Sequence, residues 1–349
     1  ASLWHASHVP QEVAPVVHFH PLEQYGLVDP RVYLASADIF HRNGSELGPA
    51  TEANLLYTTQ VPEFGLPERP PSTGDGCQCV GDEDDFDARL FVQARSTFSH
   101  AGAPYVGNRS LASVFYTAVP SGNHTATFTF WFYHSYNGCA NVRLLTTLSD
   151  TQQYNIDYNL CPLGVHEGDW ESVQVMVCAD MTVARVGYSQ HGFRVVRDCV
   201  AGDCLFADDD GVELPEGTGG DGPDRSHPVA YSALGSHAMY PEPHENAPYT
   251  QIDVSSVIPN IQAVHLVDRT RMNRDKMWIP TVSNTLHMPS DPEEVNATAL
   301  LADSTRSEYD GGTFVAFEGR WGISFLTELR DVENPVCLMA DQTVIEDCP

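Results

Sequence analysis

His166-Glu167-Gly168-Asp169-Trp170-Glu171-Ser172-Val173-Gln174-Val175-Met176-Val177 joins charged residues to an apolar run that reads as a buried strand. In a strand, successive side chains point to opposite faces, so Asp169 and Glu171 share the face of the following valines. Two carboxylates on an apolar face need a cation, a metal or a raised pKa. His166 is placed to add a third ligand, since Gly168 lets the backbone bend. The stretch predicts a metal site; the alternative is a solvated strand end that binds water or an arginine.

Length and charge limit the classes of protein. The chain has 349 residues, 42% of them hydrophobic, and 18 basic residues stand against 47 acidic ones, which gives a net charge of −29. A chain of this length can form one large all-β domain, and we expect a single domain over residues 1–349. So negative a protein repels nucleic acid and anionic membrane surfaces, so nucleic-acid binding is not expected.

Cysteines and glycosylation sequons point to an exported protein. Zinc-finger spacing is absent, so disulfides are the better interpretation of the nine cysteines. No apolar run reaches the ~20 residues of a membrane helix, and no signal peptide is visible at Ala1, which predicts a mature, soluble, secreted glycoprotein with no transmembrane segment. The expected disulfides are Cys139–Cys161, Cys199–Cys204, Cys337–Cys348 and the tight pair Cys77–Cys79, with Cys178 left as a buried free thiol. The sequons are Asn43, Asn108, Asn123 and Asn296.

Strands joined by long loops dominate the pattern. Residues 125–133 alternate between phenylalanine and polar or aromatic residues, which is typical of a strand, and further strands are expected at 170–178, 182–189, 229–234 and 313–317. An acidic Pro/Gly loop is expected over 62–87 and a Gly/Asp-rich loop over 200–227. Residues 266–278 are a candidate helix. We therefore predict a mainly β fold, a single β-sandwich with long loop insertions and few short helices.

Two histidines end predicted strands next to small residues. His191 precedes Gly192, and His237 follows Gly235 and Ser236. If these strands flank the acidic one, both imidazoles line the same pocket; the alternative for each is a hydrogen-bonded structural role. His134, beside the break at 137–138, is expected to be structural. No serine has a nucleophile-elbow context, so nucleophilic catalysis finds little support.

Four segments in order along the chain resemble the vacuolar protein sorting-associated protein 62 family. This resemblance spans nearly the whole chain and names relatives without supplying a chemistry. The segments are Phe19-His20-Pro21-Leu22-Glu23-Gln24-Tyr25, residues 164–177, Tyr231-Ser232-Ala233-Leu234-Gly235-Ser236-His237-Ala238 and Phe317-Glu318-Gly319-Arg320-Trp321-Gly322.

The acidic motif is also similar, more distantly, to that of the necrosis-inducing toxin-like proteins. That family carries Gly-His-Arg-His-Asp-Trp-Glu on a β-sandwich and holds a divalent cation used to recognise sphingolipid glycan headgroups. Asp169 and Glu171 match its acidic residues, His166 its first histidine, and Gly168 replaces the second. The resemblance implies a further upstream acidic ligand, for which Asn137 or Asp157 is the counterpart, and a jelly-roll-like sandwich.

These observations lead to three expectations for function. The first is a secreted protein that recognises a glycan or lipid headgroup through a divalent cation held by His166, Asp169 and Glu171. Oxygen ligands favour Mg²⁺ or Ca²⁺, and participation of His191 and His237 favours Zn²⁺ or Mn²⁺. The second is a structural component of an extracellular or cell-surface assembly that contacts other extracellular proteins. The third is a metal-assisted hydrolase or lyase, so whether the protein is an enzyme stays open.

Overall fold

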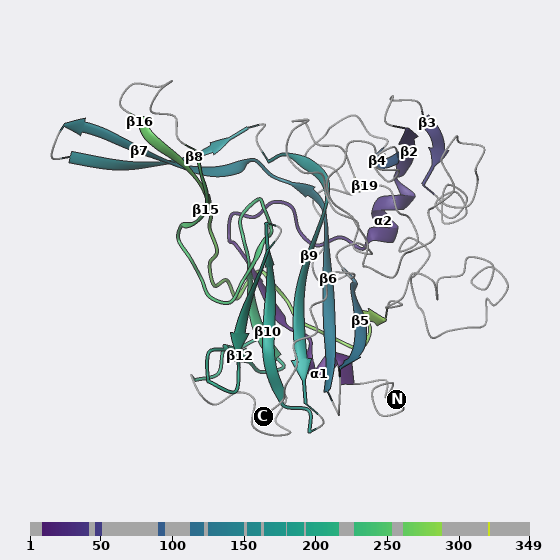
Figure 1. The fold of residues 1–349 in the computed structure, drawn as a ribbon. Coiled ribbons are helices and arrows are strands. Elements are labelled where there is room, and N and C mark those ends of the chain that lie inside the picture. The colour runs from purple at the N-terminus through teal and green to yellow at the C-terminus, as the bar shows by residue number, and fades with distance from the viewer. Residues whose placement is uncertain are drawn as a thin grey trace, which may run out of the picture.

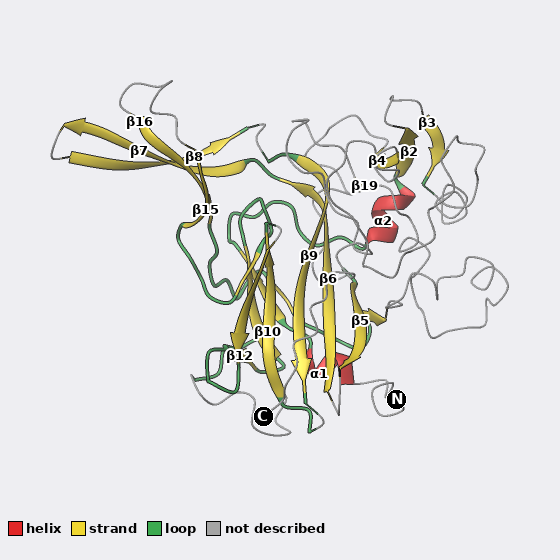
Figure 2. Cartoon of the chain, in the orientation of Figure 1, coloured by secondary structure: helices red, strands yellow, loops and turns green. Residues whose placement is uncertain are grey.

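The computed structural model is mainly β, as predicted (Figures 1 and 2). Its strands form four sheets, so one sandwich for the entire chain is not confirmed. The residues that it describes are 9–41, 46–50, 90–94, 112–121, 125–149, 152–161, 164–178, 180–191, 193–215, 227–252, 261–287 and 320–321.

A six-stranded sheet is the centre of the fold. Its longest strands, β6 (Thr125–Asn137) and β9 (His166–Val177), pair antiparallel in the middle. Along both strands, successive side chains point to opposite faces of the sheet, and apolar side chains are buried on each face. Both faces of this sheet are therefore covered by other parts of the chain. Three of the predicted strands are thereby confirmed, including β10 (Val183–Gln190). The outer strands are β11 (Phe193–Asp198), β5 (Val114–Ser121) and β18 (Thr285–His287), and the order is β11-β10-β9-β6-β5-β18.

A second sheet packs on one face of the first. Its central strand, β1 (Val16–Phe19), is buried along its entire length and runs parallel to β13 (His227–Ser232), another predicted strand. The core between the two sheets includes Phe128, Phe130 and Phe132 of β6, Val173, Val175 and Val177 of β9, and Val17, Phe19 and Trp278 of the second sheet. The remaining strands of this sheet are β12 (Phe206–Ala207), β14 (Met239–Tyr240) and β17 (Met277–Trp278), and the short helix α1 (Val9–Val13) precedes β1.

The opposite face of the six-stranded sheet has its own core. Trp131, Tyr133 and Trp170 lie there with Tyr33 of α2 (Pro30–Ala35). Helix α2 has a capped N-terminus, because Asp29 accepts a hydrogen bond from the amide of Arg31 and Pro30 occupies the first turn. A small sheet of order β19-β4-β2-β3 lies beside it, formed by β19 (Arg320–Trp321), β4 (Leu90–Ala94), β2 (Ala37–His41) and β3 (Glu46–Pro49).

The fourth sheet is an arm that continues from one end of β6 and β9 (Figure 1). Strand β6 leads into β7 (Ala140–Ser149), and β8 (Gln152–Leu160) leads back to β9. The disulfide Cys139–Cys161 joins the start of β7 to the end of β8, where the arm begins, with 4.9 Å between the Cα atoms. The arm is completed by β15 (Ala247–Ile252) and β16 (Ile261–Asp268).

Two sequence predictions are wrong. Residues 266–278 are not a helix: β16 ends at Asp268, and a loop leads to β17. Residues 261–268 form a strand, residues 269–273 are irregular, and a turn at 274–275 precedes β17. Cys178 is not a free thiol, because it is disulfide-bonded. Its apolar strand context gave no sign of a disulfide. The predicted disulfides Cys139–Cys161 and Cys199–Cys204 are confirmed.

Other predictions lie outside the described residues. These are the loop 62–87, the second half of the loop 200–227, the strand at 313–317, Cys77, Cys79, Cys337 and Cys348, and the sequons Asn43, Asn108, Asn123 and Asn296. In the described part of the chain, no helix is long and apolar enough to cross a membrane.

Candidate functional site

The backbone at Gly168 directs the acidic side chains on its two sides, Glu167 and Asp169, to opposite faces of the sheet. Its φ of +65° is in the left-handed region, which interrupts the alternation of side chains along β9. The buried Glu167 accepts hydrogen bonds from the Tyr33 hydroxyl (2.9 Å) and the Ala94 amide (3.1 Å), on the α2 side. Asp169 projects to the opposite side, where it meets His237. Two carboxylates only two positions apart therefore enter different environments.

We expect Gly168→Ala to lower the free energy of unfolding by about 1–2 kcal/mol, because a Cβ is unfavourable at this φ. Asparagine tolerates the left-handed region better, so Gly168→Asn should lose less. Chemical denaturation of the two variants measures the difference. Equal losses for alanine and asparagine would contradict the conformational explanation.

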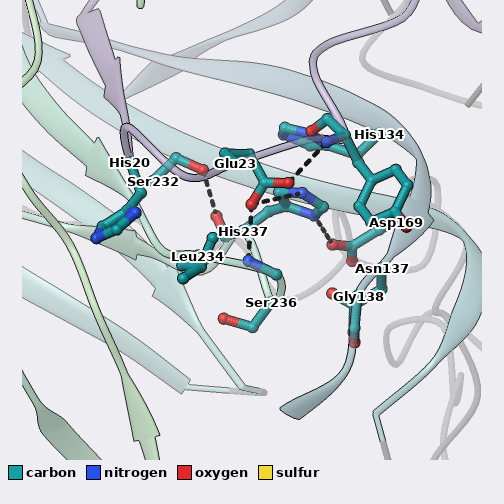
Figure 3. Close-up of polar contacts among 12 residues, drawn as sticks. His20, Glu23, His134, Asn137, Gly138, Asp169, Ser232, Leu234, Ser236 and His237 are labelled. Carbon is teal, nitrogen blue, oxygen red and sulfur yellow. Dashed lines mark hydrogen bonds and ion pairs between the residues drawn. The ribbon is translucent and has the colours of Figure 1, made fainter. Parts of the chain in front are cut away.

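A buried imidazole joins Asp169 to Glu23 (Figure 3). His237 Nδ1 lies 2.8 Å from Asp169 Oδ2, and its Nε2 lies 3.6 Å from Glu23 Oε2. The ring stacks on that of His134, with 3.7 Å between centroids. Glu23 is fixed in turn by the amides of Gly235 and Tyr25, each 2.7 Å from a carboxylate oxygen. The row Glu23–His237–Asp169 links three elements distant in sequence.

The row is ionised. Burial by itself would lower the pKa of His237, but Glu23 and Asp169 raise it to about 10. Burial would likewise raise the pKa of Glu23, yet His237 and the two backbone amides bring it below its ordinary value. At neutral pH His237 is therefore an imidazolium between two carboxylates.

Glu171 lies where two strands separate. The backbone pairing of β9 with β10 ends at Val173 and Tyr188. Beyond it, the Ser189 hydroxyl accepts a hydrogen bond from the Ser172 amide (2.8 Å) and donates one to Glu171 Oε2. Burial raises the pKa of Glu171 well above its ordinary value, and the charge of Asp169 raises it further. Asp169 contacts the His237 imidazolium, whereas Glu171 accepts its hydrogen bond from the neutral Ser189 hydroxyl, so a charge on Glu171 is not compensated as the charges of the row are.

Another buried carboxylate, Asp268, borders the same region. Its Oδ1 accepts a hydrogen bond from the Ser236 hydroxyl (2.6 Å) and its Oδ2 accepts one from the Tyr240 hydroxyl (2.7 Å). His191 Nε2 lies 2.5 Å from Oδ2. His191 also stacks on Tyr249, with 3.6 Å between centroids. The charge of Asp268 contributes to the raised pKa of Glu171. Both predicted histidines therefore contact acidic side chains near the motif: His191 contacts Asp268 and His237 contacts Asp169.

Of the other predicted site residues, His166 and Asn137 lie at the acidic motif and Asp157 lies on the arm. His166 is next to Asp169, and burial lowers the pKa of its imidazole, which favours the neutral form that a metal requires. Asn137 pairs with His166 across the strands, and its amide donates to the Gly164 carbonyl. Asp157 is on the arm, in an ion pair with Arg143 at 2.9 Å. The structure therefore gives Asp157 a partner of its own, away from the motif.

Two important members of the site, Glu23 and Asp268, were not predicted. Glu23 follows His20 by three positions and Asp268 follows His265 by three, but a single histidine at this spacing is too weak a signal to identify a site. Only tertiary contact brings Glu23 to Gly235, 212 positions away. The recurrence of Glu23 in a segment of the family resemblance was the one available signal.

The side chains of the acidic motif are of the types that bind divalent cations. Asp169 and Glu171 offer oxygen and His166 a neutral imidazole, which are suitable ligands. Among the described residues, however, no group of three or more His, Cys, Asp or Glu side chains is arranged to hold a metal ion.

Comparison with known proteins adds no relative: no protein family, no curated protein and no solved structure matches this chain.

Proposed function

We propose that this protein binds a divalent cation at Asp169 and Glu171 and uses it to recognise the hydroxyls of a glycan or lipid headgroup. The observation that supports the proposal is a pair of buried carboxylates on one face of β9, where burial first and the charge of Asp169 second raise the pKa of Glu171. A bound cation removes the cost of charging Glu171 in this place.

Charge balance favours a divalent ion. When all three are ionised, Glu23, Asp169 and Glu171 carry three negative charges, and His237 carries one positive charge, which leaves −2. Asp268 has its own partners in His191, Ser236 and Tyr240. One divalent cation would neutralise the remaining two charges.

The available ligands favour Mg²⁺ or Ca²⁺ over Zn²⁺ or Mn²⁺. The imidazoles of His237 and His191 already pair with acidic side chains, so the remaining donors are the oxygens of Asp169 and Glu171 and the imidazole of His166. An oxygen-rich site is the preference of the two hard cations.

Recognition is better supported than hydrolysis. A histidine can act as a general base only in its unprotonated form, but His237, with a pKa of about 10, is protonated at neutral pH. The disulfides and the sequons support an exported glycoprotein, and the resemblance to the toxin-like proteins supports a glycan-containing headgroup. We further propose that the two sheets that share a core are the sandwich expected from that resemblance, within a single domain.

Calorimetry with Ca²⁺, Mg²⁺, Mn²⁺ and Zn²⁺ tests the proposal. We expect Asp169→Asn and Glu171→Gln each to weaken cation binding by more than about tenfold. Binding should also release a proton, because Glu171 must ionise, and buffers of different ionisation enthalpy reveal this release. Asp157→Asn is the matched control, since it removes the same charge from the arm. Equal affinities for the wild type and Asp169→Asn would refute the assignment.

The ligand class has a separate test. We expect binding to glycan or lipid arrays to be lost in the presence of a chelator and in Asp169→Asn, while Asp157→Asn binds as the wild type does. Chelator-resistant binding would contradict the role given to the cation.

A further inference from the structure

A run of basic residues is conspicuous in so acidic a chain. Arg269, Arg271, Arg274 and Lys276 supply four of the 18 basic residues within eight positions, although the net charge is −29. They lie in the loop between β16 and β17, here called the basic loop (residues 269–276). Arg271 and Arg274 are exposed, and Arg269 and Lys276 are half-buried.

The basic loop is held against the segment that carries Glu23. The Leu234 amide donates to the Arg269 carbonyl at 2.9 Å, and the Phe19 amide donates to the Lys276 carbonyl at 2.9 Å. Lys276 Nζ donates to the carbonyls of Pro21 (2.6 Å) and Glu23 (3.0 Å). The backbone of the basic loop is therefore fixed beside the buried row, and two carbonyls hold the Lys276 ammonium in place.

The arginines of the basic loop differ from others in their pairing. In the part of the chain that the structure describes, no carboxylate lies at ion-pair distance from Arg269, Arg271 or Arg274. By contrast, Arg143 pairs with Asp157 and Arg197 with Glu242. Arg269 acts only at longer range, on Asp157, which already pairs with Arg143. Among the described residues, three neighbouring arginines without a carboxylate at ion-pair distance are a charge arrangement that an external anion would complete.

A buried histidine faces the same positive charges. His20 is 4% exposed, and burial lowers the pKa of its imidazole. Arg269, Arg271 and Lys276 lower it too, against the opposing effect of Glu23. Its Nδ1 accepts the Leu22 amide at 3.2 Å, so the proton of the neutral ring is on Nε2, which is a hydrogen-bond donor. In Figure 3, His20 lies on the other side of Glu23 from Asp169.

We infer that His20, Arg269 and Arg271 form a binding site for a phosphate group. Guanidinium groups match phosphate oxygens with two parallel hydrogen bonds, and the His20 Nε2–H adds a third donor. Because Glu23 stands between this site and Asp169, the ligand class is a phosphorylated sugar or polyol, with its phosphate at the basic loop and its hydroxyls at the cation. The second part of this inference rests on the proposed function; phosphate binding itself does not.

The first experiment measures phosphate binding without any cation. Calorimetry in chelator uses inorganic phosphate and inositol monophosphate as probes. We expect the double variant Arg269→Gln/Arg271→Gln to weaken binding by more than about tenfold, with a smaller salt dependence. Arg197→Gln, which removes one end of an exposed ion pair, should bind as the wild type does. Circular dichroism checks that the variants are folded. A wild type that does not bind either probe, or a control that loses as much as the double variant, would overturn the inference.

Two further arms identify the source of the phosphate and separate the two proposals. Phosphatidylcholine vesicles with and without phosphatidylinositol monophosphate test a lipid headgroup: selective binding to the phosphorylated vesicles, abolished in the double variant, supports a lipid source, and binding of inositol monophosphate alone supports a soluble one. Asp169→Asn should weaken cation binding but leave phosphate binding in chelator unchanged. Loss of phosphate binding in Asp169→Asn would overturn the assignment to the basic loop, whereas failure of cation binding alone would overturn only the proposed function.

Discussion

Replacing Trp170 with alanine will lower the free energy of unfolding by about 3–5 kcal/mol, the loss typical of a large aromatic side chain removed from a core. Trp170 is 5% exposed, pairs with Tyr133 across β6 and β9, and has its ring centroid 4.8 Å from that of Tyr133. It belongs to the core shared with α2.

Chemical denaturation followed by circular dichroism measures this loss. Trp170→Phe is the matched control, because it keeps an aromatic ring and leaves a smaller cavity, so its loss should be smaller. An unchanged midpoint in Trp170→Ala would show that the residue does not anchor the core.

Replacing His237 with asparagine will destabilise the protein by about 3–5 kcal/mol below pH 6.5, because Glu23 and Asp169 lose the charge between them. Asparagine is chosen because His237 has a φ of +57°, which asparagine tolerates. The pKa of His237 is raised from 6.5 to about 10, so its contribution is complete below 6.5 and is lost as the pH rises through 10.

The measurement is the difference in unfolding free energy between wild type and His237→Asn, in chelator, from pH 6 upward to pH 10. This difference should shrink with rising pH, while the other titrating groups cancel. His244→Asn is the control, since its contact with Glu242 (3.8 Å) is exposed and is worth at most about 1 kcal/mol. A difference that does not change with pH would contradict an imidazolium in the row.

The strands that could be predicted are those whose signal is local. The phenylalanines of 125–133 and the valines of 173–177 alternate, and alternation is a property of the chain next to each residue. The same local reasoning placed Asp169 and Glu171 on one face. It failed at 266–278, where a strand is followed by a loop of polar and basic residues that weakly imitates helical spacing.

The rest of the site depends on distant contacts. Glu23 meets the Gly235 amide across 212 positions, and His191 meets Asp268 across 77. No spacing in the sequence encodes either pair. Similarity to a motif suggested Asp157 for the pocket, and the sequence did not reveal that the β7–β8 register places it opposite Arg143, with which it forms an ion pair. The disulfide at Cys178 was missed for the same reason, since its apolar neighbours gave no sign of a bond.

The left-handed turn at Gly168 has a consequence for how substitutions in this chain are tolerated. A change at Glu167 should appear as poor expression, since its hydrogen bonds join β9 to α2 and β4. A change at Asp169 should alter what the protein recognises and also weaken the row, because His237 loses one of its two carboxylates. A library that scores abundance and ligand capture separately would thus find a loss of abundance at position 167 and a loss of both properties at position 169, two codons away.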